Sequence, residues 1–438
     1  MDDDSPSYVT SILGRLYLNK TEERGRALKI GPMAARRLAR GADGIEYHFR
    51  NVFLPKFLAE TRIMEATDFA SLSTADLFRA LEQLRDRFVH ATHVEVDAIN
   101  IAASFYLTQA TNLLAEHGLN PSEYMGHIPE TDEERAIAEA AHAPPGERRS
   151  LLAASMGHRA TLDYELSAPR YCETPHALDA LPVRRVPVTP ASGVDAAEET
   201  LLAGLDKRVI TAIATARRFQ ALKQDARHHS LRELALLRRI ILVLDARLEL
   251  DGMSFFLSFD ELLGLRSLSA DVVWEMAHQR QKERDQLLSH ESPPTTVTVH
   301  DIELMSIGAH AVRSEHGAAI RGTCVSGAGT VTGRARVATE ADAEAGAPIS
   351  GLETGDIIVA PMIHPAWLPY FDRAAGLVCE IGGWLSHTAI VAREYNMTMI
   401  AGTRGLNDIA DGSLLRLYPD GTVEVLPEAK LMGAVAAE

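Results

Sequence analysis

Apolar residues recur at three- and four-residue steps along most of the first three-quarters of the chain. The clearest examples are Leu77–Val89 and Glu95–Ala115, where this spacing places the apolar side chains on one face of a helix. Ser73 and Thr74 precede the first segment and are suitable N-cap residues. Another helical pattern runs, with breaks, over about residues 196–265. These patterns predict a mainly α-helical region.

Proline positions mark the boundaries of this region. Residues 175–193 hold four prolines and end in small residues, which is typical of a linker or an extended excursion. Pro293 and Pro294, followed by threonines and valines, mark a second boundary. We therefore expect a helical region at residues 1–290 and a linker at residues 291–318.

The pattern changes after about residue 316, where short segments rich in valine and isoleucine alternate with glycines. These segments read TVTGRARVA, DIIVAP, GLVCEI, LLRLYP and TVEVL. One amphipathic helix is expected among them, at about residues 386–395. The pattern predicts a compact α/β domain at residues 319–428. Its strands outnumber its helices, which argues against a doubly wound nucleotide-binding sheet.

Composition narrows the class of protein. The chain has 438 residues and a formal net charge of −16, which argues against a nucleic-acid binder because phosphate contacts need a basic surface. Its three cysteines are widely spaced, which favours a reducing compartment over a disulfide framework. The first ten residues are acidic and do not resemble a secretory signal. The most apolar helical stretch, residues 231–250, contains seven charged residues. We expect a soluble, cytoplasmic protein without a membrane span.

One motif carries clear chemistry. Residues 376–394 read as a buried strand, a turn at Gly382 and Gly383, and a helix that Ser386 would cap. His387 would then lie in the first turn, where free backbone N–H groups and the helix dipole stabilise negative charge. A neutral imidazole is a good nucleophile near pH 7. The chain contains no GxxxxGK[ST] loop, no GxGxxG at a strand–helix junction and no HExxH motif.

The run GGWLSHTAIVARE resembles the phosphohistidine motif of the phosphoenolpyruvate-utilising enzymes. SGAGTVTGRARV, PAWLPYFDRAAGLVCE and NMTMIAGTRG resemble other segments of the same domain. The resemblance implies a swivelling β/β/α phosphohistidine domain in which His387 accepts a phosphoryl group at one site and delivers it at another. The residues that it assigns to the support of the phosphohistidine are Gly382, Gly383, Ser386, Thr388 and Arg393.

A second cluster of charge lies in MGHRATLDYELSAPRY, at residues 156–171. Taken alone, it is also compatible with a solvated junction between a helix and a loop. It resembles the GHR…E…S-PR segment of the substrate region in rifamycin phosphotransferases, and LYLN and FFLSFDELLGL match other segments in the same order. The resemblance implies that the mainly α-helical region at residues 1–290 binds the substrate and that Arg159 stabilises the phosphoryl group in transit. Further candidates for the substrate site are His158, Asp163, Glu165 and Arg170, and any of the first three could accept the proton of the acceptor hydroxyl.

His90, His93, Glu95 and Asp97 form a third cluster, with a spacing that superficially resembles that of metal ligands. A polar lining of the substrate pocket, or a solvated helix face, explains it better. We therefore expect no metal site in this chain.

The resembling enzymes that use ATP carry an ATP-grasp module, and this chain shows none. It also shows no TIM barrel for pyruvate or phosphoenolpyruvate. The arrangement resembles the split-subunit phenylphosphate and alkylphenol (cresol) phosphate synthases, so we expect ATP and Mg²⁺ to be bound by an ATP-grasp partner subunit. The implied reaction moves the β-phosphoryl of ATP to His387 and then to the hydroxyl of a small phenolic acceptor, and releases AMP and phosphate. The alternatives are a split antibiotic (rifamycin-like) phosphotransferase and a non-catalytic phosphohistidine regulatory or scaffold protein.

Overall fold

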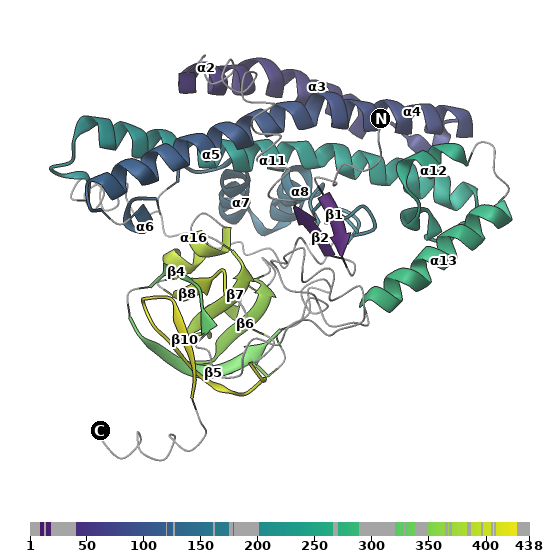
Figure 1. The fold of residues 1–438 in the computed structure, drawn as a ribbon. Coiled ribbons are helices and arrows are strands. Elements are labelled where there is room, and N and C mark those ends of the chain that lie inside the picture. Colours follow the sequence, from purple (N-terminus) through teal and green to yellow (C-terminus); the bar gives the residue numbers. More distant parts are fainter. Residues whose placement is uncertain are drawn as a thin grey trace, which may run out of the picture. The chain divides into compact units, whose positions relative to one another are not determined.

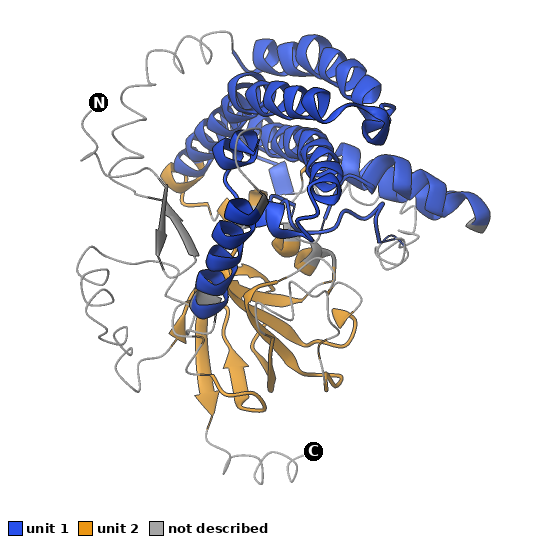
Figure 2. Ribbon diagram, turned by 90° about the vertical axis from the view of Figure 1, so that its right-hand side faces the viewer, with its two compact units in different colours: residues 1–113, 129–179, 183–293 blue, residues 114–128, 180–182, 294–438 orange. Residues whose placement is uncertain are grey.

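The computed structural model divides into two compact units (Figures 1 and 2). Unit 1 comprises residues 1–113, 129–179 and 183–293, and unit 2 comprises residues 114–128, 180–182 and 294–438. The residues that the structure describes are 9–12, 15–18, 41–119, 121–125, 128–160, 163–174, 178, 201–265, 270–288, 320–327, 329–338, 349, 351–363, 367, 370–382, 387–395, 397–403, 406 and 409–426.

The domain bounds expected from the sequence stay predictions. The two units are divided between Pro293 and Pro294. Two short segments of the predicted helical region, 114–128 and 180–182, are grouped with the C-terminal unit. The predicted linker at 291–318 lies outside the described residues, as does the predicted excursion at 175–193 apart from Leu178.

The N-terminal three-quarters of the described chain is helical, as the hydrophobic pattern predicts. A short hairpin of β1 (Val9–Ile12) and antiparallel β2 (Arg15–Leu18) precedes the helices. The helical elements are α2 (Gly41–His48), η1 (Phe49–Phe53), α3 (Leu54–Glu65), η2 (Phe69–Ser71), α4 (Thr74–Arg87), η3 (Phe88–Thr92), α5 (His93–Glu116), α6 (Pro121–Tyr124), α7 (Asp132–His142), α8 (Pro145–Met156), α11 (Lys207–Arg247), η4 (Met253–Phe256), α12 (Phe259–Gly264) and α13 (Ala270–Leu288). Within the described residues, no helix is both long and apolar enough to cross a membrane.

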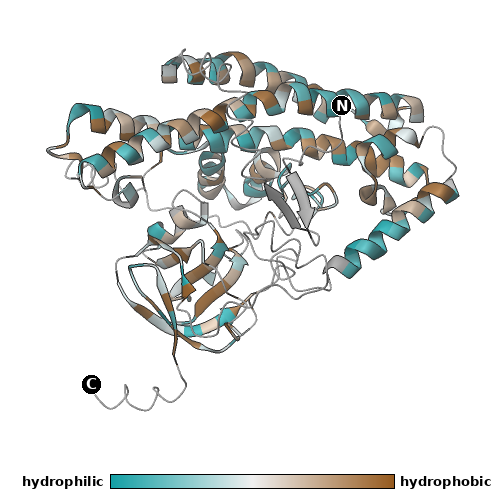
Figure 3. Cartoon of the chain, in the orientation of Figure 1, coloured by the Kyte–Doolittle hydropathy of each residue, from teal (hydrophilic) through white to brown (hydrophobic). Residues whose placement is uncertain are grey.

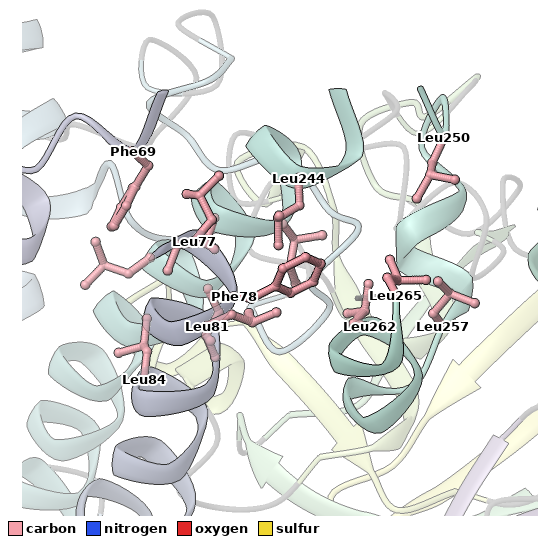
Figure 4. Close-up of a cluster of buried hydrophobic side chains, with 14 of the residues drawn as sticks. Phe69, Leu77, Phe78, Leu81, Leu84, Leu244, Leu250, Leu257, Leu262 and Leu265 are labelled. Atoms are coloured by element: carbon pink, nitrogen blue, oxygen red, sulfur yellow. The ribbon is translucent and has the colours of Figure 1, made fainter. Parts of the chain in front are cut away.

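Helix α4 shows how local sequence and packing agree. Ser73 caps it, because its hydroxyl accepts the Asp76 N–H at 3.2 Å, and this confirms the predicted cap. The apolar face of α4 is buried in a cluster with residues of α11, α12 and the loop between them (Figure 4). Each fully buried leucine or phenylalanine contributes about 1.5–3 kcal/mol of transfer free energy. The labelled members of this cluster are Phe69, Leu77, Phe78, Leu81, Leu84, Leu244, Leu250, Leu257, Leu262 and Leu265.

Helix α11 is the central element of unit 1. It has 41 residues and is therefore about 60 Å long. Asp206 caps its N-terminus by accepting the Arg208 N–H at 2.6 Å, and the chain turns away after Arg247 through Gly252, which has a positive φ of 84°. The helix buries polar as well as apolar side chains, and Figure 3 shows hydrophilic and hydrophobic residues interleaved along it. Buried charge on α11 is unusual for a core helix and points to a site beside it.

Unit 2 contains an eight-stranded sheet in the order β3-β10-β9-β5-β6-β7-β8-β4. The four strands β5 to β8 are mutually parallel, and the flanking pairs are antiparallel. The strands are β3 (Ile320–Arg321), β4 (Thr323–Ser326), β5 (Val331–Val337), β6 (Ile357–Met362), β7 (Gly376–Ile381), β8 (Thr398–Ala401), β9 (Leu414–Leu417) and β10 (Thr422–Leu426). All five strand segments expected from the sequence are confirmed.

The two edge strands of this sheet, β3 and β4, are consecutive in the chain and are joined only by Gly322. The sheet therefore curls until its edges meet. Gly322 donates its N–H to the carbonyl of Gly421 at 2.8 Å. A Cβ at Gly322 would lie 2.7 Å from the carbonyl oxygen of Ala401, and one at Gly421 would lie 2.1 Å from the carbonyl oxygen of Gly322. Glycine is thus required where the edges close.

Two hydrophobic clusters cover the two faces of the sheet. One contains Trp367 and Phe371 with residues of α16 (His387–Glu394), and the other contains apolar residues of β9 and β10. The first four residues of β7 are buried, because clusters of apolar side chains cover both of its faces. This core holds α16 against the sheet.

Candidate active site

Helix α16 lies between two parallel strands, since it follows β7 and leads into β8. The parallel strands β6, β7 and β8 end at the same edge of the sheet, and α16 begins beyond the carboxyl end of β7 at this edge. His387 is the first residue of α16, so the helix begins where the sequence predicts. The side chain of His387 and the whole of residues 383–386, including Gly383 and Ser386, lie outside the described part of the chain.

The residues around this helix start are tightly placed. The Thr388 hydroxyl donates to the carbonyl of Ile363 at 3.4 Å, which ties the first turn of α16 to the residue after β6. Gly382 is exposed, yet a Cβ there would lie 3.0 Å from the Cβ of Ala401 and 3.1 Å from the Sγ of Cys379. A side chain at residue 382 would therefore require these neighbours to shift by a few tenths of an ångström.

Arg393 lies at the other end of α16, about 9 Å along the helix axis from His387. Its Nε donates to the carbonyl of Val325 in β4 at 3.1 Å. Burial lowers the pKa of this guanidinium. The contact holds the C-terminal end of α16 against the edge strand β4.

The segment at residues 157–170 folds into a closed loop after α8. Ala160 and Arg170 form an isolated antiparallel bridge, and the Tyr171 N–H donates to the Arg159 carbonyl at 2.8 Å. Inside the loop, the Arg170 guanidinium donates to the carbonyls of Asp163 and Glu165 at 3.0 and 3.2 Å. Arg170 is therefore a structural element of the loop, and burial lowers its pKa.

Arg159 is held by two carboxylates. Its Nε and Nη2 each donate to an oxygen of Asp163 at 2.8 Å, and its Nη1 pairs with Glu133 in the first turn of α7. Only 11% of its side chain is exposed. Burial alone would lower the pKa of Arg159, but the two carboxylates outweigh it and raise the pKa. Removing a partner from such a buried pair typically costs about 3–5 kcal/mol.

The other carboxylates of the loop differ in their surroundings. Burial alone would raise the pKa of Asp163, but the hydrogen bonds and charge of Arg159 lower it, so the group is ionised. Glu165 is exposed, and its carboxylate accepts the N–H and the hydroxyl of Ser167 at 2.8 and 2.7 Å. Of the three proton-accepting candidates, Glu165 is thus the one that solvent reaches.

Two buried imidazoles lie beside Arg159. The Nε2 of His158 lies 2.8 Å from the carbonyl of His228 and donates to it, and the two rings meet edge to face at 4.8 Å. The Nδ1 of His228 is 3.4 Å from Nη1 of Arg159. Burial lowers the pKa of His158 well below its usual value, and burial with the charge of neighbouring groups lowers that of His228 to about 3. Both rings are neutral at physiological pH.

Sequence reasoning missed the residues of α7 and α11 that complete this cluster. These are Glu133, Arg227, His228 and a pair formed by Asp132 and His229. In this pair the Nε2 of His229 lies 2.9 Å from a carboxylate oxygen of Asp132. The hydrogen bond from His229 lowers the pKa of Asp132 to about 2. An Arg-His-His run on a helix and an acidic first turn after a capping box were visible signals. Nothing along the sequence shows that they meet.

The residues of the predicted cluster at His90 and His93 lie on the surface, and most of them form ion pairs there. His93 pairs with Asp97 at 3.3 Å and Glu95 with His48 at 3.5 Å, while His90 is exposed. Among the residues with a described position, no three His, Cys, Asp or Glu side chains are grouped so that they could hold a metal ion.

Comparison with known proteins adds to this geometry. Residues 352–421 match the family profile of the PEP-utilising enzyme mobile domain, a segment that contains β6, β7, α16 and β8. A rifampicin phosphotransferase of a Streptomyces species is 34% identical over 174 residues, which are 39% of this chain and 18% of that protein. One of Bacillus cereus is 34% identical over 175 residues, 39% of this chain and 19% of that protein.

The similarity to a further relative is longer but weaker. An uncharacterized protein of Mycobacterium tuberculosis is 26% identical over 387 residues, which are 80% of this chain and 42% of that protein. The chain thus spans less than half the length of each of these relatives. The family match and the start of α16 at the carboxyl edge of parallel strands agree, and residues 352–421 are similar to the mobile domain of PEP-utilising enzymes, in a chain that is similar in part to rifampicin phosphotransferases.

Proposed function

We propose that this chain is the carrier and acceptor-binding part of an ATP-dependent phosphotransferase. His387 accepts the β-phosphoryl group of ATP from a separate ATP-grasp partner, which holds the nucleotide and Mg²⁺. It then passes the group to the hydroxyl of a small phenolic acceptor, and AMP and phosphate are released. The observation that carries this proposal is the position of His387, at the start of α16, within the family match at residues 352–421.

The backbone around His387 suits a phosphorylated imidazole. The first turn of a helix has N–H groups without helical partners, and the dipole adds positive potential there. A phosphoryl group on the ring brings negative charge to this position, where the helix stabilises it. The contact between Thr388 and Ile363 and the close passage at Gly382 fix the helix start relative to the sheet.

In this proposal the helical unit supplies the acceptor site. Arg159 contributes a permanent positive charge, which stabilises the phosphoryl group during transfer. Among His158, Asp163 and Glu165, we assign the proton of the acceptor hydroxyl to Glu165, because its carboxylate is the exposed one. His158 is buried and Asp163 is engaged by Arg159.

We further propose that unit 2 moves as a swivelling domain, because one histidine must serve two centres. The connection at residues 291–318 would act as the hinge. Shortening this connection should stop multiple turnover while leaving single charging of His387 intact. Full turnover of a chain with the shortened connection would contradict the swivelling proposal.

A second candidate function is phosphorylation of a rifamycin-type antibiotic. It is favoured by the 34% identity to two rifampicin phosphotransferases. The two candidates share the carrier chemistry and differ only in the acceptor.

The test is a turnover assay with the chain, co-expressed ATP-grasp proteins, ATP and Mg²⁺. AMP and phosphate release are measured with phenol, cresols or rifampicin as acceptor. Release that depends on a phenol and yields an aryl phosphate supports the proposal, whereas release that depends on rifampicin supports the second candidate. A phosphorylated chain that transfers to none of them would favour a regulatory or scaffold role instead.

A further inference from the structure

A second arginine shares the carboxylate that holds Arg159. Arg227 of α11 donates from Nη2 to Oδ2 of Asp163 at 2.7 Å, the same oxygen that Nη2 of Arg159 contacts at 2.8 Å. The two guanidinium groups differ in exposure, since 41% of the Arg227 side chain is exposed but only 11% of the Arg159 side chain. Solvent therefore reaches the cluster at Arg227.

The two arginines also differ in what their departure would cost. If Arg159 turned toward a ligand, Glu133 and Asp163 would both lose a buried partner. If Arg227 turned away, Asp163 would keep the two hydrogen bonds from Arg159 and the one from the Ala160 N–H at 3.2 Å. The contact of Arg227 is thus the exchangeable one.

The surroundings of Arg227 leave it able to bind an anion. Its guanidinium carbon lies 5.8 Å from the ring centre of Tyr164, a residue that is 61% exposed. Its Nε is buried and has no hydrogen-bond acceptor among the described residues. The neighbouring His228 has a lowered pKa and is neutral, so it cannot form an ion pair with an added anion.

We propose that Arg227 is a catalytic residue that contacts the transferred phosphoryl group directly, while Arg159 stabilises that group through its charge and holds the carboxylate that positions Arg227. This inference rests on the proposed function, because the phosphoryl group comes from His387. The P–N bond of the phosphohistidine breaks as the P–O bond to the acceptor forms. The electron pair of the P–N bond returns to the imidazole, and the proton of the acceptor hydroxyl passes to Glu165. Arg227 moves from Asp163 to the phosphoryl oxygens, and Asp163 stays paired with Arg159.

Binding to the full chain tests the inference without the ATP-grasp partner. Phenyl phosphate and inorganic phosphate serve as probes, and their dissociation constants are measured by calorimetry at low salt. We expect Arg227→Ala to weaken binding of both about 10- to 100-fold with an unchanged melting temperature. Arg227→Lys should restore part of the affinity, because an ammonium keeps the charge but not the two-pronged contact. Arg208→Ala is the matched control, since Arg208 is an exposed arginine on the same helix.

Unchanged phosphate affinity in a folded Arg227→Ala variant would overturn the inference, as would a wild-type chain that binds neither probe. Binding of phosphate but not phenyl phosphate, lost in Arg227→Ala, would support the phosphoryl contact and count against a phenolic acceptor. The proposed function is tested separately by the charging of His387, which Arg227→Ala should leave unchanged. The two ideas can therefore fail independently.

Discussion

The two units place their functional groups by different means. In unit 2, the backbone places His387, because α16 begins at the carboxyl edge of three parallel strands. The edges of the same sheet meet at Gly322. In unit 1, side chains from three separate segments place Arg159, namely Glu133 of α7, Asp163 of the loop after α8 and, through Asp163, Arg227 of α11. Under the proposed function, a phosphoryl carrier that meets two partners needs only a fixed backbone frame, whereas the acceptor site needs charges held at fixed distances to stabilise the phosphoryl group.

The largest effect is expected from Arg159. Arg159→Ala leaves two carboxylates without their main cation, and the unfolding free energy of unit 1 should fall by about 3–5 kcal/mol. Transfer from His387 to the acceptor should fall by about two to four orders of magnitude, and Arg159→Lys should recover only part of it. Charging of His387 by the partner should persist, because it depends on unit 2. A stable variant that transfers at the wild-type rate would remove Arg159 from the mechanism.

Acid should also destabilise unit 1 more than unit 2. His228 has a folded-state pKa of about 3, mainly through burial, against about 6.5 when unfolded. Below pH 6.5 the unfolded chain gains a proton that the folded chain does not, so stability is lost as the pH falls toward 3. The loss is at most about 1.4 kcal/mol per pH unit. His228→Gln should flatten this slope in denaturant titrations, whereas His93→Gln, which is exposed on α5, should not. Equal slopes in wild type and His228→Gln would contradict the account.

The smallest effect is expected from the closure of the sheet in unit 2. Gly322→Ala forces a Cβ to within 2.7 Å of a carbonyl oxygen, which should cost about 1–3 kcal/mol in the melting of unit 2. Gly329→Ala is the control, because a Cβ there meets nothing within 4 Å. Unit 1 should be unaffected by either change. A Gly322→Ala variant as stable as the control would show that the edges need not meet at this glycine.

The same contrast explains what could be predicted from the sequence. The strands Gly376–Ile381 and Thr422–Leu426 and the helix at His387 follow from local patterns, so they were predicted to within a residue or two. The strand β8 (Thr398–Ala401) was missed as a separate element, because four residues between glycine-rich loops give too little pattern. The strand β4 was also missed, and its pairing with β8 depends on a closure that no local pattern encodes.

The cluster around Arg159 was predicted only in part. The loop after α8 was visible as a dense run of charge that resembles the rifamycin phosphotransferases, and Arg159 and Asp163 do meet in it. Glu133 and Arg227 lie 26 and 64 residues away along the chain from their partners in that loop. Their meeting is set by the packing of α7 against α8 and α11, which depends on tertiary contacts. The sequence therefore indicated the charged residues of the loop but not their ion-pair partners on other helices.

The most direct test of the central claim follows the phosphoryl group itself. ATP labelled at either the β- or the γ-phosphorus is incubated with the chain, its ATP-grasp partner and Mg²⁺, and the labelled residue is identified by mass spectrometry. The account predicts that the β-label alone enters the chain, at His387, as an acid-labile and alkali-stable adduct that His387→Asn abolishes. Label from the γ-phosphorus would contradict the account. So would β-label that persists in His387→Asn and is lost only when another histidine is substituted.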